Sequence, residues 1–579
     1  MADSSGESWI YIIGAGLFLW MAAMGWRVCY LHLSEGKTRS YRFTTILPAP
    51  RGQIYDSVNH ELPLAGNLAA WDVAIDYKNL PPEGPGRGKI AGILADAMDM
   101  DADVVLDYFR RACARGNRGL PLGRTLNPEV ETLARSKGPL FRYVSTTRTY
   151  VRHYPQNERL CQTLGYVDKD GNGAMGLERA LDAYLRGAEG RIVGTRDAFG
   201  NEIRHLRSSA IAPEPGADVF LTIDSRIQYA AETELRNAME QHHATGAWAV
   251  VQRVPTGELL AIASMPDFDL NRYADCDRDC WRNKSVISMY EPGSTMKTLT
   301  VAAALNERIV TPDTVIDVGQ GPWYYGGFYL RDHSDGPITV STIIKKSSNK
   351  GTAMIALRLG NERLEGYLRA LGFGSKVGIG LPAESPGSLD RHQAWDKVRP
   401  TRIAIGQGIA VTALQMANLY ATLGNGGTMM KPFLVERVVA ADGTVLEENR
   451  PTVMGRPFRP DTAAKMRDML VSVTEAGGTA GRHTAVQGFR VAGKTGTAQI
   501  PGIGGYSQTD YWATFVGFAP AERPEVAIVV VVERPKPLHS GGVVAAPVFS
   551  RIATASLQYL GVTPPEADDT EASRERPFQ

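Results

Sequence analysis

At 579 residues the chain is too long for one ordinary domain, and its 43% hydrophobic and 22% charged residues are typical of a folded protein. The 63 basic and 62 acidic residues leave a net charge of +1, so no overall field would attract nucleic acid. Five irregularly spaced cysteines exclude a disulfide framework. The close pair Cys276 and Cys280 has no second cysteine pair or histidines nearby, so we expect no metal site, and the two thiols could be free or paired with each other. Nothing in the sequence calls for a cofactor.

The chain begins with a candidate membrane span. Residues 9–26 carry no charge and, extended to residue 29, are long enough to cross a bilayer. A cleaved signal peptide is the alternative, but no Lys or Arg precedes the stretch and no Ala-x-Ala site ends it, so we favour an uncleaved anchor at 9–29. Four basic residues follow the span, which by itself would place that side in the cytoplasm, although this tendency weakens for long translocated domains.

The region from residue 30 to residue 215 reads as mixed α and β structure without a catalytic pairing. Its predicted elements are strands at 71–77 and 147–154, one or two amphipathic helices at 90–115, a helix at 176–185, and a Pro/Gly-rich loop at 80–89. We therefore expect a structural role for this region.

The pattern changes at Gly216, where strands come first, then many helices, then strands again. The order predicts an antiparallel sheet with helices gathered around it, an α+β domain over 216–563, with the nearly all β-branched strand 526–533 at its centre. The acidic, Pro-containing tail 564–579 is predicted to be disordered. The other predicted elements are strands at 219–223, 489–497 and 512–518, a hairpin of 247–254 with 259–264, a helix from Ser225, two helices within 338–359 broken near Ser347, and a capped helix from Thr412 to Gly424.

A Ser-x-x-Lys string lies at Ser294 and Lys297, where Pro292 and Gly293 precede a predicted helix over 298–310. Residues three apart on a helix share a face, so the hydroxyl and the amine can meet, and a serine beside an amine is one form of activated nucleophile. The simpler interpretation is a helix cap, the commonest use of serine at a helix start. The string also occurs at residues 34–37 and 347–350, so alone it decides nothing.

Two further strings follow in order, Ser347-Ser348-Asn349 and Lys494-Thr495-Gly496-Thr497. With Ser294-x-x-Lys297, the set resembles the penicillin-recognising serine acyl-enzymes, namely penicillin-binding proteins and serine β-lactamases. Residues 488–495 also fit the phosphate-loop pattern G-x-x-x-x-G-K-[ST]. That pattern requires a loop between a strand and a helix, whereas these residues are strand-like and no helix can start after them, so we reject a nucleotide site.

More of the chain, roughly residues 45–560, resembles class B penicillin-binding proteins. The residues that carry this resemblance are Arg51-Gly52-x-Ile54-x-Asp56, Leu221–Asp224, Pro255–Glu258, Pro266–Asp269, Gly406-Gln-Gly408 and Ser540–Phe549, the last of which resembles the division-type subgroup more than the elongation-type one. The resemblance implies a cytoplasmic N-terminus at 1–8, a single transmembrane helix at 9–29, an elongated, dimerisation-like non-catalytic pedestal at 30–215, and a penicillin-binding transpeptidase domain at 216–563. It further implies a protein of the inner membrane whose catalytic domain lies in the periplasm.

The resemblance assigns Ser294 as the nucleophile that attacks the D-Ala-D-Ala end of a stem peptide. Lys297 can act as its base only when neutral, which requires a pKa lowered by about 3 units, or roughly 4 kcal/mol. Burial would supply part of this shift, and Lys494 as a second cation would supply more. In the family, Ser347 relays a proton to the leaving amine and Asn349 holds the substrate amide.

The remaining implied contacts lie on the Lys-Thr-Gly string. Lys494 and Thr495 would bind the substrate carboxylate, and Gly496 would let the substrate backbone lie close to the strand. The oxyanion would lie between the backbone N–H groups of Ser294 and Thr497.

The resemblance thus implies a peptidoglycan D,D-transpeptidase that is acylated by β-lactams and acts in septal wall synthesis. The alternatives are a D,D-carboxypeptidase or β-lactamase of the same fold, and a non-enzymatic penicillin-sensing relative. No glutamate carries the local pattern of the class A β-lactamase residue that activates water. The implied partners are stem peptides, β-lactams, a SEDS-type glycosyltransferase and other division proteins.

Overall fold

The computed structural model describes residues 5–33, 41–115, 120–135, 138–140, 142–196, 202–332, 334–502 and 504–564. The chain divides into two compact units. Unit 1 is drawn from Met1–Pro50, Ala69–Tyr150 and Gly187–Pro215, and unit 2 from Arg51–Leu68, Val151–Arg186 and Gly216–Gln579. The region predicted at 30–215 therefore contains segments of both units, since Arg51–Leu68 and Val151–Arg186 belong to unit 2. The tail predicted to be disordered, except Pro564, and the Ser-x-x-Lys string at 34–37 lie outside the described residues.

The first helix, α1 (Ser5–Leu33), contains the predicted anchor at 9–29. Among the residues that the structure describes, it is the one helix long and apolar enough to cross a membrane, over Tyr11–Tyr30, and none of that stretch is buried. A long, mostly apolar helix whose span is not buried against its own protein fits a membrane anchor.

The other described residues of unit 1 form two small sheets and three helices. One sheet has the strand order β1-β6-β7 and the other β4-β3-β5, whose strands β3 and β5 extend into the segments of unit 2. The strands are β1 (Tyr41–Leu47), β3 (Gly66–Ile75), β4 (Leu120–Thr125), β5 (Val144–His153), β6 (Gly190–Arg196) and β7 (Ser209–Ile211). The helices are α2 (Pro85–Met98), α3 (Ala102–Arg115) and α4 (Glu129–Ala134), with short 3-10 turns η1 (Tyr77–Asn79) and η2 (Arg204–Leu206).

A separate core holds unit 1 together, built from residues such as Ile75, Leu94 and Phe109, each fully buried. The loop predicted at 80–89 is wrong in its second half, because α2 already begins at Pro85. Proline suits the first position of a helix, where its missing N–H would have no partner anyway. The predicted helical stretch 90–115 is two helices, separated where Asp99 adopts a left-handed conformation.

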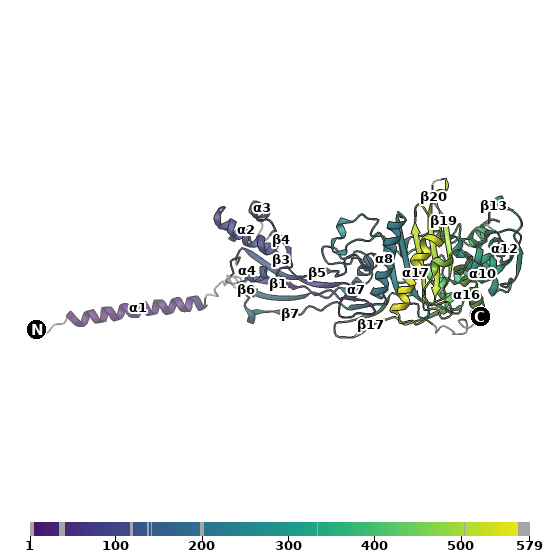
Figure 1. Cartoon of the computed structure of the whole chain (residues 1–579). Helices are drawn as coiled ribbons and strands as arrows, with labels where there is room; N and C mark the ends of the chain where they lie inside the picture. Colours follow the sequence, from purple (N-terminus) through teal and green to yellow (C-terminus); the bar gives the residue numbers. More distant parts are fainter. Residues whose placement is uncertain are drawn as a thin grey trace, which may run out of the picture. The chain divides into compact units, whose positions relative to one another are not determined.

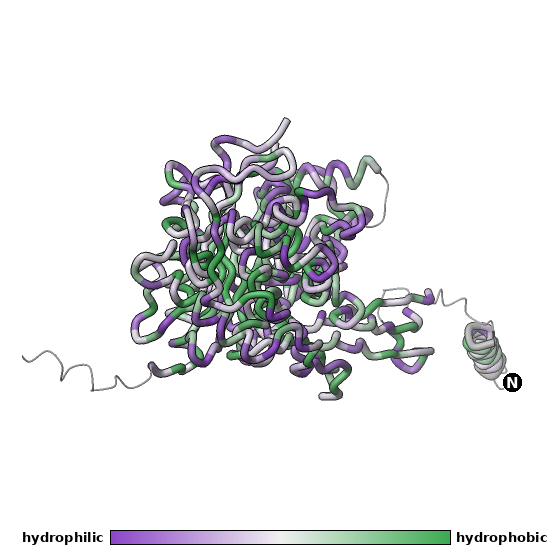
Figure 2. The backbone as a smooth tube through the Cα atoms, turned by 90° about the vertical axis from the view of Figure 1, so that its right-hand side faces the viewer, coloured by the Kyte–Doolittle hydropathy of each residue, from purple (hydrophilic) through white to green (hydrophobic). Residues whose placement is uncertain are grey.

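Unit 2 is built on a five-stranded antiparallel sheet with the order β10-β9-β21-β20-β19. Its strands are β9 (Gly246–Arg253), β10 (Leu259–Met265), β19 (Ala492–Gly502), β20 (Gly505–Ala519) and β21 (Val526–Glu533). The predicted central position of β21 and the predicted β9–β10 hairpin are both confirmed. All residues of β21 from Val526 to Val532 are buried, and hydrophobic backbone, green in Figure 2, runs through the interior of this unit.

Helices cover both faces of this sheet, so the predicted α+β plan is confirmed. On one side α8 (Ser225–Gln241) and α17 (Gly541–Tyr559) pack on the strands and on each other. On the other side lie α10 (Lys297–Asn306), α15 (Ala413–Gly424) and α16 (Pro460–Thr474) (Figure 1). As predicted, α15 begins with a capping box, in which Thr412 and Gln415 each satisfy a backbone N–H of the other.

A second sheet of unit 2 has the order β17-β16-β8-β2. The strand predicted at 219–223 is β8 (Asp218–Leu221), which joins this sheet rather than the central one. It pairs with β2 (Ile54–Tyr55) and β16 (Val435–Val439), and β17 (Val445–Glu448) pairs with β16. The helix predicted at 176–185 is broken at Leu181 into α6 (Gly176–Ala180) and α7 (Asp182–Leu185).

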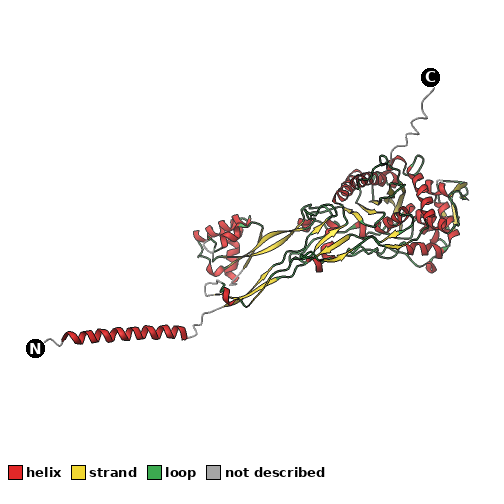
Figure 3. Cartoon of the chain, turned by 90° about the horizontal axis from the view of Figure 1, so that it is seen from below, coloured by secondary structure: helices red, strands yellow, loops and turns green. Residues whose placement is uncertain are grey.

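The other elements of unit 2 are short and surround the central sheet (Figure 3). The helices are α5 (Cys161–Leu164), α9 (Lys284–Ile287), α11 (Val340–Lys346), α12 (Asn349–Leu359), α13 (Asn361–Ala370) and α14 (Arg399–Ala404). The strands are β11 (Val315–Asp317), β12 (Trp323–Tyr325), β13 (Phe328–Leu330), β14 (Pro337–Thr339), β15 (Met429–Met430) and β18 (Val453–Gly455). The 3-10 turns are η3 (Leu270–Asp275), η4 (Gly293–Met296), η5 (His392–Ala394) and η6 (Gly481–Thr484).

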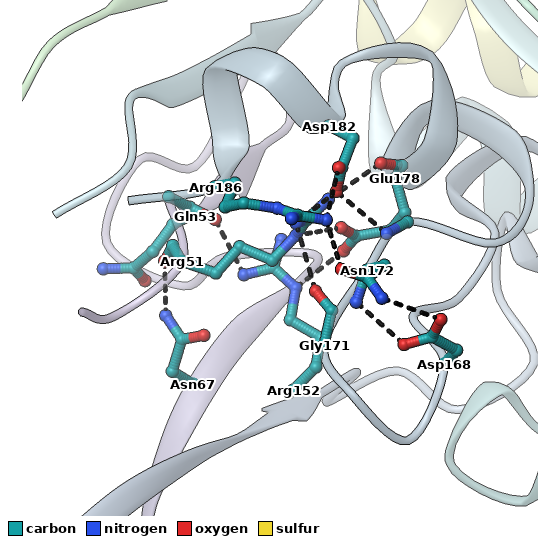
Figure 4. A network of polar contacts seen from close by, with 12 residues as sticks. Arg51, Gln53, Asn67, Arg152, Asp168, Gly171, Asn172, Glu178, Asp182 and Arg186 are labelled. Atoms are coloured by element: carbon teal, nitrogen blue, oxygen red, sulfur yellow. Dashed lines mark hydrogen bonds and ion pairs between the residues drawn. The ribbon is translucent and has the colours of Figure 1, made fainter. Parts of the chain in front are cut away.

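Buried charges tie the early segments of the chain into unit 2. Glu178, fully buried, accepts from Arg51 Nε and Arg152 Nε at 2.6 Å each, and Arg51 also reaches Asp182 at 2.7 Å (Figure 4). The neighbouring Gly52 has no room for a side chain, because a Cβ there would lie 1.9 Å from the carbonyl oxygen of Ala217. The Arg51-Gly52 string therefore has a structural reason within unit 2: one residue neutralises a buried carboxylate and the next permits close backbone packing.

Candidate active site

Ser294 lies in the 3-10 turn η4, which continues directly into α10. No side-chain hydrogen bond caps either element, and no hydrogen bond of the described residues ends on the Ser294 hydroxyl, so the helix-cap interpretation is wrong. The predicted helix over 298–310 is shorter than expected, because α10 ends at Asn306. Arg308 adopts a left-handed conformation (φ 57°), and the N–H of Ile309 bonds back to Ala304, which closes the helix.

Two hydrogen bonds, from Tyr420 and to Gly406, hold the turn of Ser294 in place. The Tyr420 hydroxyl, fully buried, donates to the carbonyl oxygen of Thr295 at 3.0 Å and lies 2.8 Å from the Thr298 hydroxyl. The N–H of Gly293 donates to the carbonyl oxygen of Gly406 at 3.1 Å, and a Cβ at Gly406 would lie 2.1 Å from the oxygen of Gly293. The Gly406-Gln-Gly408 string thus packs directly on the turn of the candidate nucleophile.

The Ser347-x-Asn349 string occupies the break between α11 and α12, as the sequence predicts. Ser347 ends α11 in a left-handed conformation (φ 59°), a strained state for a residue with a Cβ. Ser348 then begins α12, where its hydroxyl accepts from the N–H of Gly351 at 3.0 Å. This sharp change of direction presents Ser347 and Asn349 to the same side as α10.

The side chains of the three strings meet around the Ser347 hydroxyl. Lys297 Nζ donates to Ser347 Oγ at 3.1 Å and to Asn349 Oδ1 at 2.7 Å, and it also reaches the backbone oxygen of Ser347. Lys494 Nζ donates to the same Ser347 Oγ at 2.9 Å. Four predicted residues from three distant strings are thus joined in one hydrogen-bonded cluster.

Both amines of this cluster are fully buried, and this burial changes their protonation. Burial lowers the pKa of Lys297 from 10.5 to about 7, against a smaller opposite influence of the Asp332 carboxylate. Burial also lowers the pKa of Lys494, and the nearby charge of Lys297 lowers it further. The lowered pKa predicted for Lys297 thus arises from burial. The repulsion between the two cations lowers the pKa of Lys494 rather than that of Lys297.

The Lys-Thr-Gly string lies within β19, one of the two edge strands of the central sheet. The strand continues to Gly502, so no helix follows Thr495 and a phosphate loop is excluded. The Thr495 hydroxyl lies 2.8 Å from that of Thr479. The Thr497 hydroxyl accepts from the N–H of Gly541 at 3.1 Å, which connects this strand to the start of α17.

Gly496 has an intramolecular reason for lacking a side chain. A Cβ there would lie 2.9 Å from the carbonyl oxygen of Pro292 and 3.0 Å from Cγ2 of Thr295. The glycine therefore lets β19 approach the turn of Ser294. Its implied role toward the substrate backbone remains a prediction.

Sequence reasoning missed two carboxylates that lie near the motif strings. Glu291 Oε1 accepts from the N–H of Gly408 at 2.8 Å and from the Tyr506 hydroxyl at 3.0 Å, and burial raises the pKa of Glu291. Asp332 accepts from the N–H of Lys350 at 3.0 Å and from the Ser348 hydroxyl. Glu291 could have been found from the sequence, because it lies only three residues before Ser294. Asp332 belongs to none of the three motif strings, so no sequence pattern points to it.

Cys276 and Cys280 are free thiols, and burial together with the neighbouring Cys280 raises the pKa of Cys276 to about 12. In the part of the chain that the structure describes, no group of three or more histidine, cysteine, aspartate or glutamate side chains is arranged to hold a metal ion.

Comparison with known proteins identifies the family. Residues 247–554 match the family model of the penicillin binding protein transpeptidase domain, and residues 46–221 match that of the penicillin-binding protein dimerisation domain. A probable peptidoglycan D,D-transpeptidase PenA of Neisseria gonorrhoeae is 34% identical over 97% of this chain and 94% of its own length. The peptidoglycan D,D-transpeptidase FtsI of Escherichia coli is 29% identical over 96% and 93%.

Solved structures agree with this result. Penicillin binding protein 3 of Mycobacterium tuberculosis, complexed with aztreonam, aligns with a TM-score of 0.69 at 29% identity over 90% of this chain and 98% of that one. Penicillin binding protein 2X of Streptococcus thermophilus aligns with a TM-score of 0.75 at 25% identity over 92% and 82%. The chain therefore belongs to the penicillin-binding proteins, and it has the class B arrangement of a dimerisation domain followed by a transpeptidase domain. The predicted resemblance and fold class are confirmed.

Proposed function

We propose that the protein is a peptidoglycan D,D-transpeptidase that forms an acyl-enzyme at Ser294 from the D-Ala-D-Ala end of a stem peptide and is acylated there by β-lactams. The observation that carries this proposal is the convergence of two buried amines, Lys297 and Lys494, on the Ser347 hydroxyl beside the turn of Ser294. Relatives named as peptidoglycan D,D-transpeptidases over almost the whole chain support the same reaction.

In the first step, Ser294 Oγ bonds to the carbonyl carbon of the penultimate D-Ala, and the hydroxyl proton passes to Lys297. Lys297 can accept it because a pKa of about 7 leaves about half of the amine neutral at pH 7. The negative charge that develops on the carbonyl oxygen is held by the backbone N–H groups of Ser294 and Thr497, and losing one such donor typically costs about 3–4 kcal/mol.

In the second step, the bond to the terminal D-Ala breaks, and its amine leaves with a proton that Ser347 relays. Ser347 suits a relay, because its oxygen accepts from both amines while its own proton can be passed on. Lys494 and Thr495 bind the terminal carboxylate of the substrate through charge-assisted hydrogen bonds. Asn349 holds the substrate amide.

The acyl-enzyme is then attacked by the amine of a second stem peptide, which regenerates the Ser294 hydroxyl and forms the crosslink. Because β19 is an edge strand of its sheet, an extended peptide can lie along it with backbone hydrogen bonds. Hydrolysis by water is the competing fate and gives a D,D-carboxypeptidase or a β-lactamase. A penicillin-sensing relative would form the adduct without turning over stem peptides.

The cellular setting follows from α1 and from the relatives. We infer that α1 anchors the protein in the inner membrane with residues 1–8 in the cytoplasm and the catalytic domain, placed at 216–563, in the periplasm. A division role is supported by the relative named FtsI and by the Ser540–Phe549 string. A SEDS-type glycosyltransferase and other division proteins are the proposed partners.

Labelling with a fluorescent penicillin tests the nucleophile. The full-length protein should form a stable covalent adduct, and Ser294→Ala should form none. Ser472→Ala is the control, since that hydroxyl donates to the oxygen of Met469 in its own helix α16. Labelling of the Ser294→Ala variant would refute the assignment, and rapid release of the adduct would favour a β-lactamase. A crosslinking assay with a glycan-strand synthase then separates a transpeptidase from a carboxypeptidase.

A further inference from the structure

An aromatic hairpin lies next to the Ser347-x-Asn349 string. Strands β12 and β13 pair antiparallel, with Tyr324 opposite Tyr329. Because side chains alternate along a strand, these two tyrosines lie on one face of the hairpin. The opposite face carries Trp323, Tyr325, Phe328 and Leu330.

The face of the hairpin that carries Phe328 is turned toward the rest of unit 2. The guanidinium of Arg402 lies 4.0 Å from the centre of the Phe328 ring. At the tip of the hairpin, a Cβ at Gly326 would lie 2.4 Å from Cγ2 of Val398. Val398 is the N-cap of α14 and Arg402 lies within that helix, which leads into the Gly406-Gln-Gly408 string. The tip is therefore fixed to the segment that supports the turn of Ser294.

The tyrosine face is turned toward solvent. Tyr324 is 59% exposed and Tyr329 is 72% exposed. Their ring centres lie 4.9 Å apart, and the rings are tilted by 51°. Two large aromatic rings held together in water are a feature that usually marks a binding surface. No hydrogen bond of the described residues ends on either hydroxyl, so both remain available to a ligand.

The base of the hairpin is bound to the active-site cluster. Asn349 Nδ2 donates to the carbonyl oxygen of Arg331 at 3.1 Å, and Asn349 Oδ1 accepts from Lys297 at 2.7 Å. Lys350, fully buried, donates to Asp335 Oδ1 at 3.0 Å and to the oxygen of Gly321 at 2.8 Å. Two hydrogen bonds thus connect the hairpin backbone to the proposed base, and both ends of the hairpin are fixed. In Figure 1, β13 and α12 lie at the same end of unit 2.

We propose that Tyr324 and Tyr329 bind a sugar ring of the glycan strand that carries the stem peptide. The inference rests on the proposed function, because a transpeptidase of peptidoglycan must accept a peptide that is attached to sugar. A pyranose ring presents a face of C–H groups and an edge of hydroxyls. The C–H face can pack on the aromatic rings while the sugar hydroxyls bond to the two phenol groups.

The size of the surface favours a sugar over a protein partner. A stable protein interface needs about 800 Å² from each partner, far more than two tyrosine rings can supply. A sugar ring is comparable in size to the pair of rings. The position also fits, since the base of the hairpin is hydrogen-bonded to Asn349, which the proposed function places against the stem peptide of the same molecule.

Binding of peptide-free glycan strands to the full-length protein tests the proposal. Titration calorimetry would compare the wild type with Tyr324→Ala/Tyr329→Ala and with Tyr324→Phe/Tyr329→Phe. Tyr229→Ala is the matched control, because this tyrosine of α8 is 53% exposed and lies outside the hairpin. We expect the alanine pair to weaken binding by about tenfold or more, the phenylalanine pair to retain most of it, and the control to bind as the wild type. All variants should be acylated by penicillin at the wild-type rate, which also verifies their folding.

Several results would overturn the proposal. Unchanged glycan binding by the alanine pair would show that the surface serves another occupant, such as a protein. Displacement of the glycan strand by a sugar-free stem peptide would assign the surface to the peptide instead. The same titration on Ser294→Ala, which cannot be acylated if the proposed function is correct, separates the two questions. Glycan binding by that variant supports the sugar site, whereas its labelling by penicillin would refute the proposed nucleophile.

Discussion

Because the pKa of the proposed base Lys297 is lowered to about 7, we expect the rate of acylation by penicillin to depend on pH near neutrality. Only the neutral amine can accept the Ser294 proton. With a pKa of about 7, the neutral fraction is about one half at pH 7, about nine tenths at pH 8 and about one tenth at pH 6. With the ordinary value of 10.5, it would be only about three in ten thousand at pH 7. Burial of this one amine thus increases the competent fraction more than a thousandfold.

Stopped-flow measurement of adduct formation between pH 5.5 and pH 9 would check this dependence. The acylation rate constant should fall about tenfold from pH 8 to pH 6 and level off above pH 8. Asp332→Asn removes a charge that raises the pKa of Lys297, so the inflection should move to lower pH. Asp442→Asn, an exposed residue of the turn between β16 and β17, is the control and should leave it unchanged. A rate that is flat from pH 6 to pH 8, or an inflection near pH 10, would refute Lys297 as the base.

Three further predictions concern stability and close packing. The pKa of Lys297 is lower in the folded than in the unfolded protein, so the folded protein binds fewer protons between pH 7 and pH 9. The contribution of Lys297 to the free energy of unfolding should therefore rise by about 2 kcal/mol from pH 7 to pH 9. Chemical denaturation would measure this rise, which should be absent in Lys297→Met. Glu178→Gln leaves the buried Arg152 without a counter-charge and Arg51 with Asp182 alone, and should cost about 3–5 kcal/mol. The exposed ion pair lost in Glu131→Gln should cost under about 1 kcal/mol, and equal melting temperatures of the two variants would contradict this. Gly496→Ala should slow acylation more than about tenfold, because the added Cβ displaces the turn of Ser294. Gly455→Ala is the control, since a Cβ there meets nothing within 4 Å. Equal acylation rates of the two variants would count against the close approach of β19 to the turn of Ser294.

Local patterns predicted the elements whose structure depends on nearby residues. The hairpin at Pro255–Glu258 and the capped helix from Thr412 formed as expected, because turn and cap residues act within a few positions of themselves. The valines of β21 predicted its central place, since a strand without a polar face must be covered on both sides. Boundaries were less accurate where distant contacts decide them, as at Leu181, where a helix is broken in two.

Membership of a unit could not be predicted, because it depends on partners far away in the sequence. Arg51 lies 127 residues from Glu178, and nothing in the order of the chain indicates that a carboxylate from the middle of the first region would be buried against it. The same charges hold the segments around Arg51 and Glu178 within unit 2. A buried ion pair that loses one partner is costly, so these segments must stay with unit 2 for it to be stable.

The motif residues were predictable as a set, but the physical reasons for their spacing were visible only in the fold. Gly496 is needed because β19 and the turn of Ser294 touch, and that contact brings Lys494 to the Ser347 hydroxyl. The three strings are therefore one packed arrangement, in which the close approach of two backbones buries two amines and lowers their pKa values. Burial that would be a defect in a purely structural protein is, in this site, what makes a lysine able to accept a proton at neutral pH.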